Sequence, residues 1–437
     1  MLTLDVSKKI AIIGGGAAGC FCAVEAARLN PQAQVIVYEA GSRPMAKLAV
    51  TGGGRCNITN TFGIEALRNM ADDNVTRDLS SYRTFGDIGR LEEVYPRGAQ
   101  LLKRVFKVFG PEDTVAWWER EGVRLVAQDD GCIFPASQDA MQVVRTLERL
   151  MREFGVELRC GHRVQRILAP AAGVPSYSPS SSTGETLVIG RDADAVVVTV
   201  GGCSSAALRS LLPSEVEVTS TVPSLFTFRL SDAGVHSLMG TVVQDATLSL
   251  AGTAFRSRGT LLLTDWGCSG PATLRLSSYA AIHLAEHQYR STLLINWLSL
   301  SEDGARALLQ SLEGPRTVGN SRPEGLTDRL WHHILGRAGI DAARRWPELG
   351  SKGRNRLVNA LVADQYEITG RARFKEEFVT CGGVSLRSVN PSTLEARSCP
   401  GLFFAGEALD VDALTGGFNL QAAWSCAIVV ARSLALR

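Results

Sequence analysis

The chain has 437 residues, of which 45% are hydrophobic, and its 46 Lys and Arg residues offset 44 Asp and Glu residues to give a net charge of +2. This length exceeds one comfortable hydrophobic core, so two or three domains are expected, and the balanced charge favours neither nucleic acid nor an anionic membrane as a partner. No apolar run is long enough to span a bilayer, MLTLDVSKK lacks a signal-peptide core, and the ten cysteines contain no Cys-x-x-Cys pair. A cytoplasmic location with reduced cysteines is therefore expected, without a disulfide redox centre.

The first predicted elements form a dinucleotide-binding βαβ unit. Residues 10–13 are an apolar run typical of a buried parallel strand, and Gly14, Gly16 and Gly19 follow with G-x-G-x-x-G spacing. The first glycine makes a tight turn, the second lets the backbone approach a pyrophosphate, and the third lets the helix over Ala17–Leu29 pack on the strand. The pyrophosphate is expected at the N-terminus of this helix.

The second strand of this unit, residues 35–38, leads into Glu39, twenty residues after Gly19. A carboxylate at this position accepts hydrogen bonds from an adenosine ribose and disfavours a 2′-phosphate. The expected nucleotide is therefore FAD or NAD and not NADP. Because the strand, glycines, helix, second strand and acid are all in register, a glycine turn without a ligand is the less favoured interpretation.

The chain then alternates helical and strand patterns. A helix is expected from Pro111 to Gly122, followed by strands at VRLVAQ and CIFP, and Ser137 precedes a long amphipathic helix that Gly155 ends. VELRC, RVQRILA and TLVIG are predicted strands, the last two joined as an exposed hairpin across the Pro- and Ser-rich stretch PAAGVPSYSPSSSTG. Residues 194–202, DAVVVTVGG, are a third buried strand expected to pass near the first glycine loop.

The pattern changes after Gly202. From about residue 203 to 375, strand patterns such as TVVQDATLSL and GTLLLT alternate with helical ones such as DRLWHHILGRA, which predicts an inserted substrate or cap domain with a β half and a helical half. GLFFAGE and TGGFNLQAAWSCAIVVARSLA then return to a buried strand, a glycine turn and a helix. The predicted fold class is α/β, with a Rossmann-like domain built from residues 1–202 and 376–437 around the insertion at 203–375.

Three shorter motifs are given less weight. His283, Glu286 and His287 have the H-x-x-E-H spacing of an inverted zincin, but zinc needs a third protein ligand, so an exposed helix face is favoured and no metal site is predicted. The clusters RSRG at 256–259 and SKGRNR at 351–356 are predicted to be solvated loops rather than contacts to phosphate or RNA.

Four longer motifs carry a resemblance to a known family. They are KLAVTGGGRCNITN at 47–60, CIFPASQDA at 132–140, LLLTDWGCSGPATL at 261–274 and GLFFAGEALDVDALTGGFNLQAAWS at 401–425. Nearly the whole chain resembles the BaiN-like flavoproteins, which include aminoacetone oxidase, within the two-dinucleotide-binding-domain FAD superfamily. The resemblance implies a glutathione-reductase-like FAD-binding domain, FAD held non-covalently in an extended pose, and an inserted domain over the isoalloxazine.

The resemblance also indicates which residues contact the cofactor. In the glycine-rich loop formed by Gly52–Gly54 and the residues that follow, Arg55 would add positive charge, and the Asn57 amide could both donate and accept hydrogen bonds. Cys56 is either a reactive thiol or a small buried contact. Glu407 is expected at the ribityl region, and the helix that starts near Asn419 points at the flavin pyrimidine, where reduction places negative charge. The predicted cofactor-binding set is Gly14, Gly16, Ala17, Ala18, Gly19, Glu39, Lys47, Gly54, Arg55, Cys56, Asn57, Val164, Gly406, Glu407, Phe418, Asn419 and Leu420.

Three segments depart from the family pattern. Asp265 stands where the family usually has His, so a proton-transfer role at that position is in doubt, and no catalytic residue is predicted. Ala413 replaces a usual glycine, and TVGG at 199–202 replaces the commoner ATGG, a change that is expected to leave the strand crossing intact. These changes affect the substrate assignment and leave the cofactor assignment in place.

The predicted function is an FAD-dependent oxidoreductase that passes a hydride between a small organic molecule and N5 of the flavin. In the reductase version, NAD(P)H docks transiently, because no second complete G-x-G-x-x-G is present, and the reduced flavin then reduces an enone-like double bond. In the oxidase version, a small amine reduces FAD and oxygen reoxidises it. The alternative of another class is a flavin-binding sensor or RNA-associated protein. The oligomeric state has no signal in the sequence.

Overall fold

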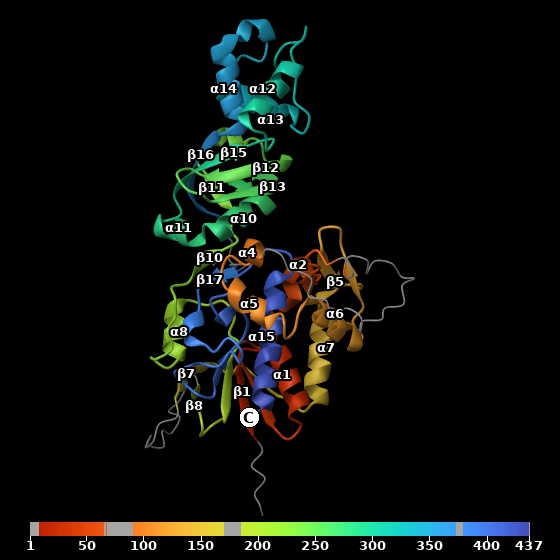
Figure 1. The fold of residues 1–437 in the computed structure, drawn as a ribbon, viewed down its shortest axis with the longest axis vertical. Coiled ribbons are helices and arrows are strands. Elements are labelled where there is room, and N and C mark those ends of the chain that lie inside the picture. Colours follow the sequence, from red (N-terminus) through yellow and green to blue (C-terminus); the bar gives the residue numbers. More distant parts are fainter. Residues whose placement is uncertain (1–7, 65–66, 68–90, 170–184, 373–378, 437) are drawn as a thin grey trace, which may run out of the picture. The chain divides into compact units, whose positions relative to one another are not determined.

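The computed structural model describes residues 8–64, 67, 91–169, 185–372 and 379–436, and the chain divides into two compact units. The first unit combines Met1–Thr221 with Thr380–Arg437, and the second is the continuous segment Val222–Val379. In Figure 1 the red N-terminal and blue C-terminal elements occupy the same unit, which carries the labels α1 and α15. Both ends of the chain therefore build one unit around an inserted segment.

A parallel sheet organises the first unit. Its described strands run in the order β18-β9-β1-β2-β6, and every neighbouring pair is parallel. Strand order reverses at β1, because β2 lies on one side of it and β9 on the other, and ligands of such sheets bind in the crevice at the carboxyl ends of the strands around this point. The strands are β1 (Lys9–Ile13), β2 (Gln34–Glu39), β6 (Glu157–Cys160), β9 (Ala195–Val198) and β18 (Leu402–Phe404).

Three long helices of the first unit pack side by side. α1 (Ala17–Leu29) contacts both α15 (Phe418–Ala435) and α7 (Ala140–Glu153), and Figure 1 shows it between them. The N-cap of α7 is Asp139, whose carboxylate accepts a hydrogen bond from the Met141 N–H at 2.8 Å. This helix therefore starts with an aspartate cap and ends before Gly155 is reached, a slightly shorter span than the sequence pattern predicts.

Aromatic side chains join the N-terminal and C-terminal parts of the first unit. Phe21 of α1 lies 4.4 Å from Trp117 and 5.1 Å from Trp424 of α15, measured between ring centroids. Trp117 belongs to α6 (Pro111–Arg120), and all three rings are buried. Such pairs add about 0.5–1.5 kcal/mol each beyond the burial of their area, so α15 is a structural part of the first unit and not an appendage.

The other described elements of the first unit are short. Strands β3, β5 and β4 form a small antiparallel sheet, and helix α8 and the turns of 3₁₀-helix connect the larger elements. These short elements are η1 (Leu48–Val50), α2 (Thr51–Gly54), β3 (Thr59–Asn60), α4 (Leu91–Val94), α5 (Ala99–Val105), β4 (Leu125–Ala127), β5 (Cys132–Pro135), α8 (Ser205–Leu211), η5 (Leu386–Ser388) and η6 (Gly406–Ala408).

One predicted connection is wrong. β7 (Val164–Leu168) and β8 (Glu185–Val188) pair in parallel, whereas a hairpin would make them antiparallel. Two parallel strands cannot be joined by a tight turn, because the chain must cross back before it starts the second strand. The Pro- and Ser-rich stretch predicted to form the hairpin connection falls, at residues 170–184, outside the described residues.

Six of the described strands of the second unit close into a barrel in the order β11-β14-β13-β12-β15-β16. Alternate side chains point inward and are buried, as in Leu248, Leu261 and Ile295, so the barrel is filled by its own aliphatic residues. The strands are β11 (Phe228–Leu230), β12 (Val242–Leu250), β13 (Arg256–Thr264), β14 (Gly267–Ser269), β15 (Ser291–Asn296) and β16 (Asp364–Arg371).

The described second unit also contains helices. They are α9 (Ala233–His236), α10 (Pro271–Tyr279), α11 (Ala281–Glu286), α12 (Glu302–Ser311), α13 (Asp328–Arg337), η4 (Trp346–Leu349) and α14 (Gly350–Val362). The predicted loops at 256–259 and 351–356 are wrong, because the first begins β13 and the second lies in α14. Each basic cluster occupies the exposed face of a regular element whose other face is buried, and polar residues alone do not distinguish that situation from a loop. Among the described residues, the helices lack the combined length and apolarity needed to cross a bilayer.

The chain crosses between the two units near β10 (Val222–Ser224) and β17 (Val379–Cys381). Residues 203–221 stay with the first unit, although the change in sequence pattern comes earlier. Backbone hydrogen bonds hold them there, from Thr219 N–H to the Gly383 carbonyl oxygen at 2.8 Å and from Ser385 N–H to the Glu217 carbonyl oxygen at 2.9 Å. The sequence pattern does not predict these hydrogen bonds, because they join residues more than 160 positions apart.

Candidate functional site

The glycine loop between β1 and α1 leaves open space at one of its glycines. A Cβ atom on Gly14, whose φ is +106°, would lie 2.6 Å from the Thr199 carbonyl oxygen, and a Cβ on Gly19 would lie 1.9 Å from the Gly14 carbonyl oxygen. A Cβ on Gly16 would meet nothing within 4 Å. Gly14 and Gly19 are therefore needed for packing, whereas Gly16 leaves room where a dinucleotide pyrophosphate would lie.

The N-terminus of α1 has the character of an anion site. Gly16 is its N-cap and has no side chain with which to cap the first turn. The first N–H groups of a helix, here those of Ala17 and Ala18, lack carbonyl partners within the helix and attract negative charge. The Thr199 hydroxyl fixes the loop by donating to the carbonyl oxygen of Gly14 at 2.8 Å. The threonine that departs from the family pattern thus ties β9 to the glycine loop.

The Glu39 carboxylate lies at the end of β2 and is held by two backbone amides. One oxygen accepts from Gly15 N–H at 2.8 Å and the other from Gly41 N–H at 2.6 Å. Each oxygen retains a second lone pair, with which it can accept from a ribose hydroxyl. Val164 begins β7 two residues after His162, whose N–H donates to the Glu39 carbonyl oxygen at 2.9 Å, so the two predicted contacts lie on neighbouring segments.

The glycine-rich loop has a backbone that other residues rarely adopt. Gly52, Gly53 and Gly54 have φ angles of +62°, +69° and +83°, and a Cβ on either of the last two would meet nothing within 4 Å. The Arg55 guanidinium lies over the Phe134 ring, 4.3 Å from its centroid. The loop therefore presents open backbone beside a cation that is held in place by an aromatic ring.

Cys56 is a buried contact in this loop and not a reactive thiol. Its side chain is fully buried, and that burial raises the thiol pKa to about 12. A thiol with a raised pKa stays protonated near neutral pH, whereas the thiolate is the reactive form. Alkylation of the native protein with iodoacetamide, mapped by peptide mass spectrometry, is expected to modify the partly exposed Cys160 and Cys203 well before Cys56. Modification of Cys56 at a comparable rate would contradict this assignment.

Asn57 connects the glycine-rich loop to the start of α15. With its amide oriented to satisfy the surrounding groups, the nitrogen donates to the Thr59 carbonyl oxygen at 2.8 Å and to that of Ile133 at 3.2 Å, and the oxygen accepts from Gly417 N–H at 3.0 Å. The side chain is thus occupied by the protein backbone. Its role as a ligand for the cofactor remains a prediction.

The N-terminus of α15 is a second uncapped helix start. Its N-cap, Gly417, has a φ of +84°, and a Cβ there would lie 2.3 Å from the Thr59 carbonyl oxygen, so only glycine fits. The first helical residues are Phe418, Asn419 and Leu420. The Asn419 side chain turns back to the preceding loop, where it accepts from Ala413 N–H at 3.0 Å and donates to the Ala413 carbonyl oxygen at 3.1 Å. It is therefore the backbone N–H groups of this turn, and not the asparagine amide, that suit an anionic ligand.

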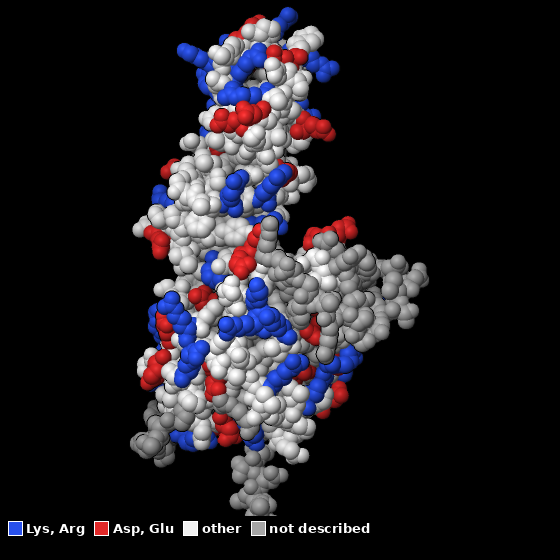
Figure 2. Space-filling view, in the orientation of Figure 1, with Lys and Arg blue, Asp and Glu red and all other residues white. Residues whose placement is uncertain are grey.

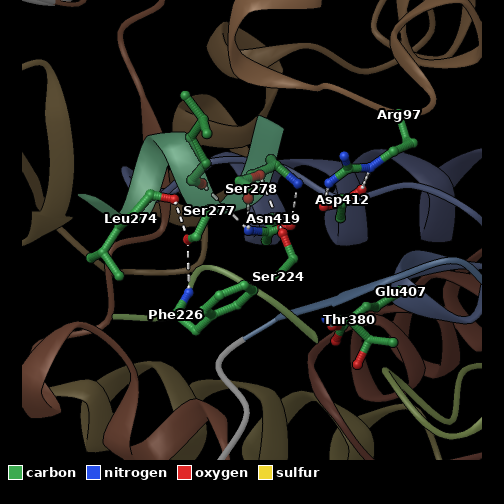
Figure 3. A network of polar contacts seen from close by, with 12 residues as sticks. Arg97, Ser224, Phe226, Leu274, Ser277, Ser278, Thr380, Glu407, Asp412 and Asn419 are labelled. Atoms are coloured by element: carbon green, nitrogen blue, oxygen red, sulfur yellow. Dashed lines mark hydrogen bonds and ion pairs between the residues drawn. The ribbon is translucent and has the colours of Figure 1, made fainter. Parts of the chain in front are cut away.

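Glu407 holds two chain segments together. One carboxylate oxygen accepts from Gly202 N–H at 3.0 Å and the other from Thr380 N–H at 2.7 Å; Figure 3 shows Glu407 beside Thr380. Burial raises the pKa of this carboxyl group, and the two amides together with the charge of Lys47 oppose that rise. Gly406, with a φ of +69°, lets η6 approach α1, because a Cβ on it would lie 3.0 Å from the Cβ of Ala18.

All the predicted cofactor-binding residues lie in the first unit. Three described contacts bring their segments together: Gly406 against Ala18, Asn57 with Gly417, and the Lys47 charge near Glu407. Open space at Gly16 and at Gly53–Gly54, and two helix N-termini without side-chain caps, fit an extended dinucleotide with anionic groups. Sequence reasoning missed the ion pair between Arg97 and Asp412, which supports the loop before α15.

The H-x-x-E-H motif and the two basic clusters of the second unit make contacts within the protein. Among the described residues no cluster of three His, Cys, Asp or Glu side chains suits a metal, and the His283 and His287 rings lie 4.2 Å apart without a third ligand. Arg258 is paired with Asp245 at 2.6 Å, and Arg354 with Glu313. Figure 2 shows acidic and basic side chains interspersed on this unit. A field of one sign, of the kind that attracts nucleic acid, does not cover the face shown.

The chain is similar over nearly its whole length to proteins of one family. Residues 8–89 and 85–433 match the family model described as HI0933-like protein Rossmann domain. A 3-dehydro-bile acid delta(4,6)-reductase of Clostridium scindens is 27% identical over 442 residues, 98% of this chain and 99% of that protein. A ribosomal RNA dihydrouridine synthase of Escherichia coli is 26% identical over 439 residues, 97% of each chain. Among solved structures, 3-ketosteroid delta1-dehydrogenase from Sterolibacterium denitrificans is 12% identical, with a TM-score of 0.44 and coverage of 98% of this chain and 100% of that one.

Proposed function

The chain belongs to the HI0933-like family of FAD-binding flavoprotein oxidoreductases, and from that premise we propose that it is a reductase that delivers a hydride to a carbon–carbon double bond conjugated with a carbonyl group. The observation that carries the cofactor part of the proposal is the pair of uncapped helix N-termini after Gly16 and Gly417. They follow the carboxyl ends of β1 and β18, two strands of the same parallel sheet. Sites of this kind bind the phosphates and anionic groups of nucleotides.

Each segment of the candidate site has its own part in holding FAD. The N-terminus of α1 would receive the pyrophosphate in the space at Gly16, and Glu39 would accept from the adenosine ribose. The glycine-rich loop, with Arg55 stacked on Phe134, would lie against the flavin. Glu407 and Asn57 would act chiefly by fixing these segments, because their side chains are already hydrogen-bonded to backbone groups.

FAD, when bound, supplies an N5 atom that accepts and donates a hydride. The first turn of α15 would stabilise the negative charge that reduction places on the pyrimidine ring. A helix N-terminus contributes about 0.3–1 kcal/mol to such stabilisation, and up to ~2 kcal/mol where it is partly buried. Since 30 mV corresponds to about 1.4 kcal/mol for a two-electron couple, this turn would raise the flavin potential by tens of millivolts at most.

The proposed substrate class is supported by what the names of two relatives share. The names of the bile acid reductase and the dihydrouridine synthase both describe saturation of a carbon–carbon double bond, in a steroid and in a uracil ring. In both rings the double bond is conjugated with a carbonyl group, which accepts the electron density as hydride adds. This shared chemistry favours a reductase over an oxidase for the present chain and leaves a steroid-like molecule and RNA as the two sources of such a bond. NAD(P)H is the proposed electron donor.

The proposal is tested by the visible absorption spectrum of the purified protein, recorded without oxygen. NADH or NADPH is expected to bleach the flavin band, and a 4,6-dien-3-one steroid or a uridine-containing RNA hairpin, added next, is expected to restore it; which of the two does so identifies the source of the double bond. Bleaching by a small primary amine but not by NAD(P)H, with recovery in oxygen, would assign an oxidase instead. A protein that takes up no flavin when FAD is supplied would overturn the proposal altogether.

A further inference from the structure

A groove lies on the outer face of the barrel in the second unit. Strand β12 buries Leu248 and Leu250 inside the barrel, so Thr247 and Ser249, which alternate with them, lie on the outer face, where they line the groove. Its other walls come from β13, β15, the turn before β13 and the end of α14. The groove has a volume of about 510 Å³, and sites for small molecules typically measure about 300–1,000 Å³.

The groove carries a positive charge. Arg256 is the one charged side chain among its described lining residues, which include no Asp or Glu. Arg256 is exposed, and its side chain forms no hydrogen bond or ion pair with any residue that the structure describes. Ser249 lies directly opposite Arg256 in the pairing of β12 with β13, and its hydroxyl also lacks a partner among the described residues. A guanidinium beside an unoccupied hydroxyl can donate to the oxygens of a carboxylate or phosphate.

The next arginine on the same strand is already paired. The Arg258 guanidinium makes two hydrogen bonds to the Asp245 carboxylate, one to each oxygen, at 2.7 and 2.6 Å. Bidentate pairs of this kind occupy the guanidinium and cancel its charge. Arg256, two residues earlier on β13, is therefore the arginine of this pair of neighbours whose charge is left for a ligand.

Apolar side chains form the rest of the groove. Leu294 pairs with Ser249 across β12 and β15, and Phe255 and Val362 add an aromatic ring and an aliphatic side chain. All three side chains are partly exposed. The Phe255 ring packs beside that of His283, with 5.7 Å between the ring centroids, so its position is fixed. A ligand that covered these side chains would remove apolar surface from water.

We propose that this groove binds a small organic anion, with a carboxylate or phosphate head at Arg256 and Ser249 and an aromatic or other apolar body over Phe255, Leu294 and Val362. One charged head and a body of one or two rings match the single cation and the volume of the groove. Single-stranded RNA is a poorer match, because a groove that follows its backbone needs several cations. The inference does not rest on the proposed function, since the groove belongs to the second unit and the residues proposed to hold FAD belong to the first.

The test measures the affinity of the full-length protein for three probes by ligand-observed NMR titration: 2-naphthoate, 2-naphthyl phosphate and the uncharged 2-naphthalenemethanol. At least one anion is expected to bind more tightly than the alcohol, and the tighter of the two anions identifies the head group. Arg256→Gln is expected to weaken anion binding about 10-fold or more, because hydrogen bonds to a charged group are lost, and to leave binding of the alcohol unchanged. The matched control is Arg290→Gln, which changes an exposed arginine outside the groove whose side chain also has no described partner.

A second variant, Leu294→Trp, places a larger side chain in the groove and is expected to weaken binding of all three probes. Anion affinity that is no higher than that of the alcohol, or that Arg256→Gln leaves unchanged, would overturn the proposal. Unchanged affinities in folded Leu294→Trp protein would place the probes elsewhere and overturn it too; if this variant does not fold, the comparison of Arg256→Gln with Arg290→Gln decides alone. Binding of a single-stranded oligouridylate without binding of either anion would assign the groove to RNA instead.

Discussion

Gly16→Val is expected to yield a folded protein that no longer holds FAD. A side chain at this position meets no protein atom within 4 Å, so the native fold accommodates its first atoms, but it enters the space proposed for the pyrophosphate. The loss should exceed 100-fold in FAD affinity, because the ligand loses its contacts to the α1 N-terminus and also encounters two methyl groups. Equilibrium dialysis with FAD, alongside circular dichroism of the apoprotein, measures both effects.

Two further glycine variants serve as comparisons for Gly16→Val. Gly314→Val, in the second unit, also places a side chain in open space and is expected to leave FAD affinity unchanged. Gly19→Ala should instead disturb the fold itself, because its Cβ would lie 1.9 Å from the Gly14 carbonyl oxygen. Full flavin content in folded Gly16→Val protein would refute the placement of the pyrophosphate.

Glu407→Ala is expected to destabilise the first unit strongly. It removes the acceptor of two backbone N–H groups, those of Gly202 and Thr380, which come from segments far apart in the chain. Each buried donor left without a partner costs about 1–3 kcal/mol, so for two donors a loss of about 2–6 kcal/mol in the free energy of unfolding is expected for the FAD-free protein. Hydrogen–deuterium exchange in rising urea, read at β9 and β18, measures this loss within the first unit.

The matched control for this variant is Asp194→Ala. Its carboxylate accepts from one backbone amide, Lys9 N–H, at 2.7 Å, and this amide is exposed, so water can replace the acceptor and the loss should stay below about 1 kcal/mol. The pH dependence supplies an independent check. Because the pKa of Glu407 is raised in the folded state, the carboxyl group favours folding less as the pH rises from the ordinary glutamate pKa, about 4.3, through the raised value. Glu407→Ala should lack this decline; an unchanged decline would assign it to another group.

The parts of the fold that sequence predicts well are those with local signals. The glycine spacing after residues 10–13, the apolar run at β18 and the long helix after Gly417 all lie within single segments, and each is confirmed, as is the resemblance to the BaiN-like flavoproteins. Pairing partners have no such signal. The parallel pairing of β7 with β8 and the closure of the barrel in the second unit depend on contacts between distant segments, which a one-dimensional pattern does not encode.

In the candidate site too, the sequence predicts the local motifs and not the contacts that the side chains make. Residue types that suit a nucleotide are evident from the motifs, but the use of each side chain is not, because backbone groups compete with a ligand for the same hydrogen bonds. Asn57, Glu407 and Asn419 were predicted as cofactor contacts, and all three have side chains bonded to the protein backbone. Arg97 had no signal at all, since its partner Asp412 lies 315 residues away. The cofactor contacts themselves stay predictions.

The construction of the first unit from two separate stretches has a consequence for biosynthesis. During translation, residues 1–221 leave the ribosome long before α15. The face of α1 that contacts α15 in the folded protein therefore stays exposed until α15 is synthesised. The continuous second unit can fold in the interval, since domains generally fold as units during synthesis. The crevice proposed for FAD is complete only when residues 380–437 arrive, and a nascent chain should therefore acquire flavin late, and after a period in which a chaperone has an apolar surface to bind.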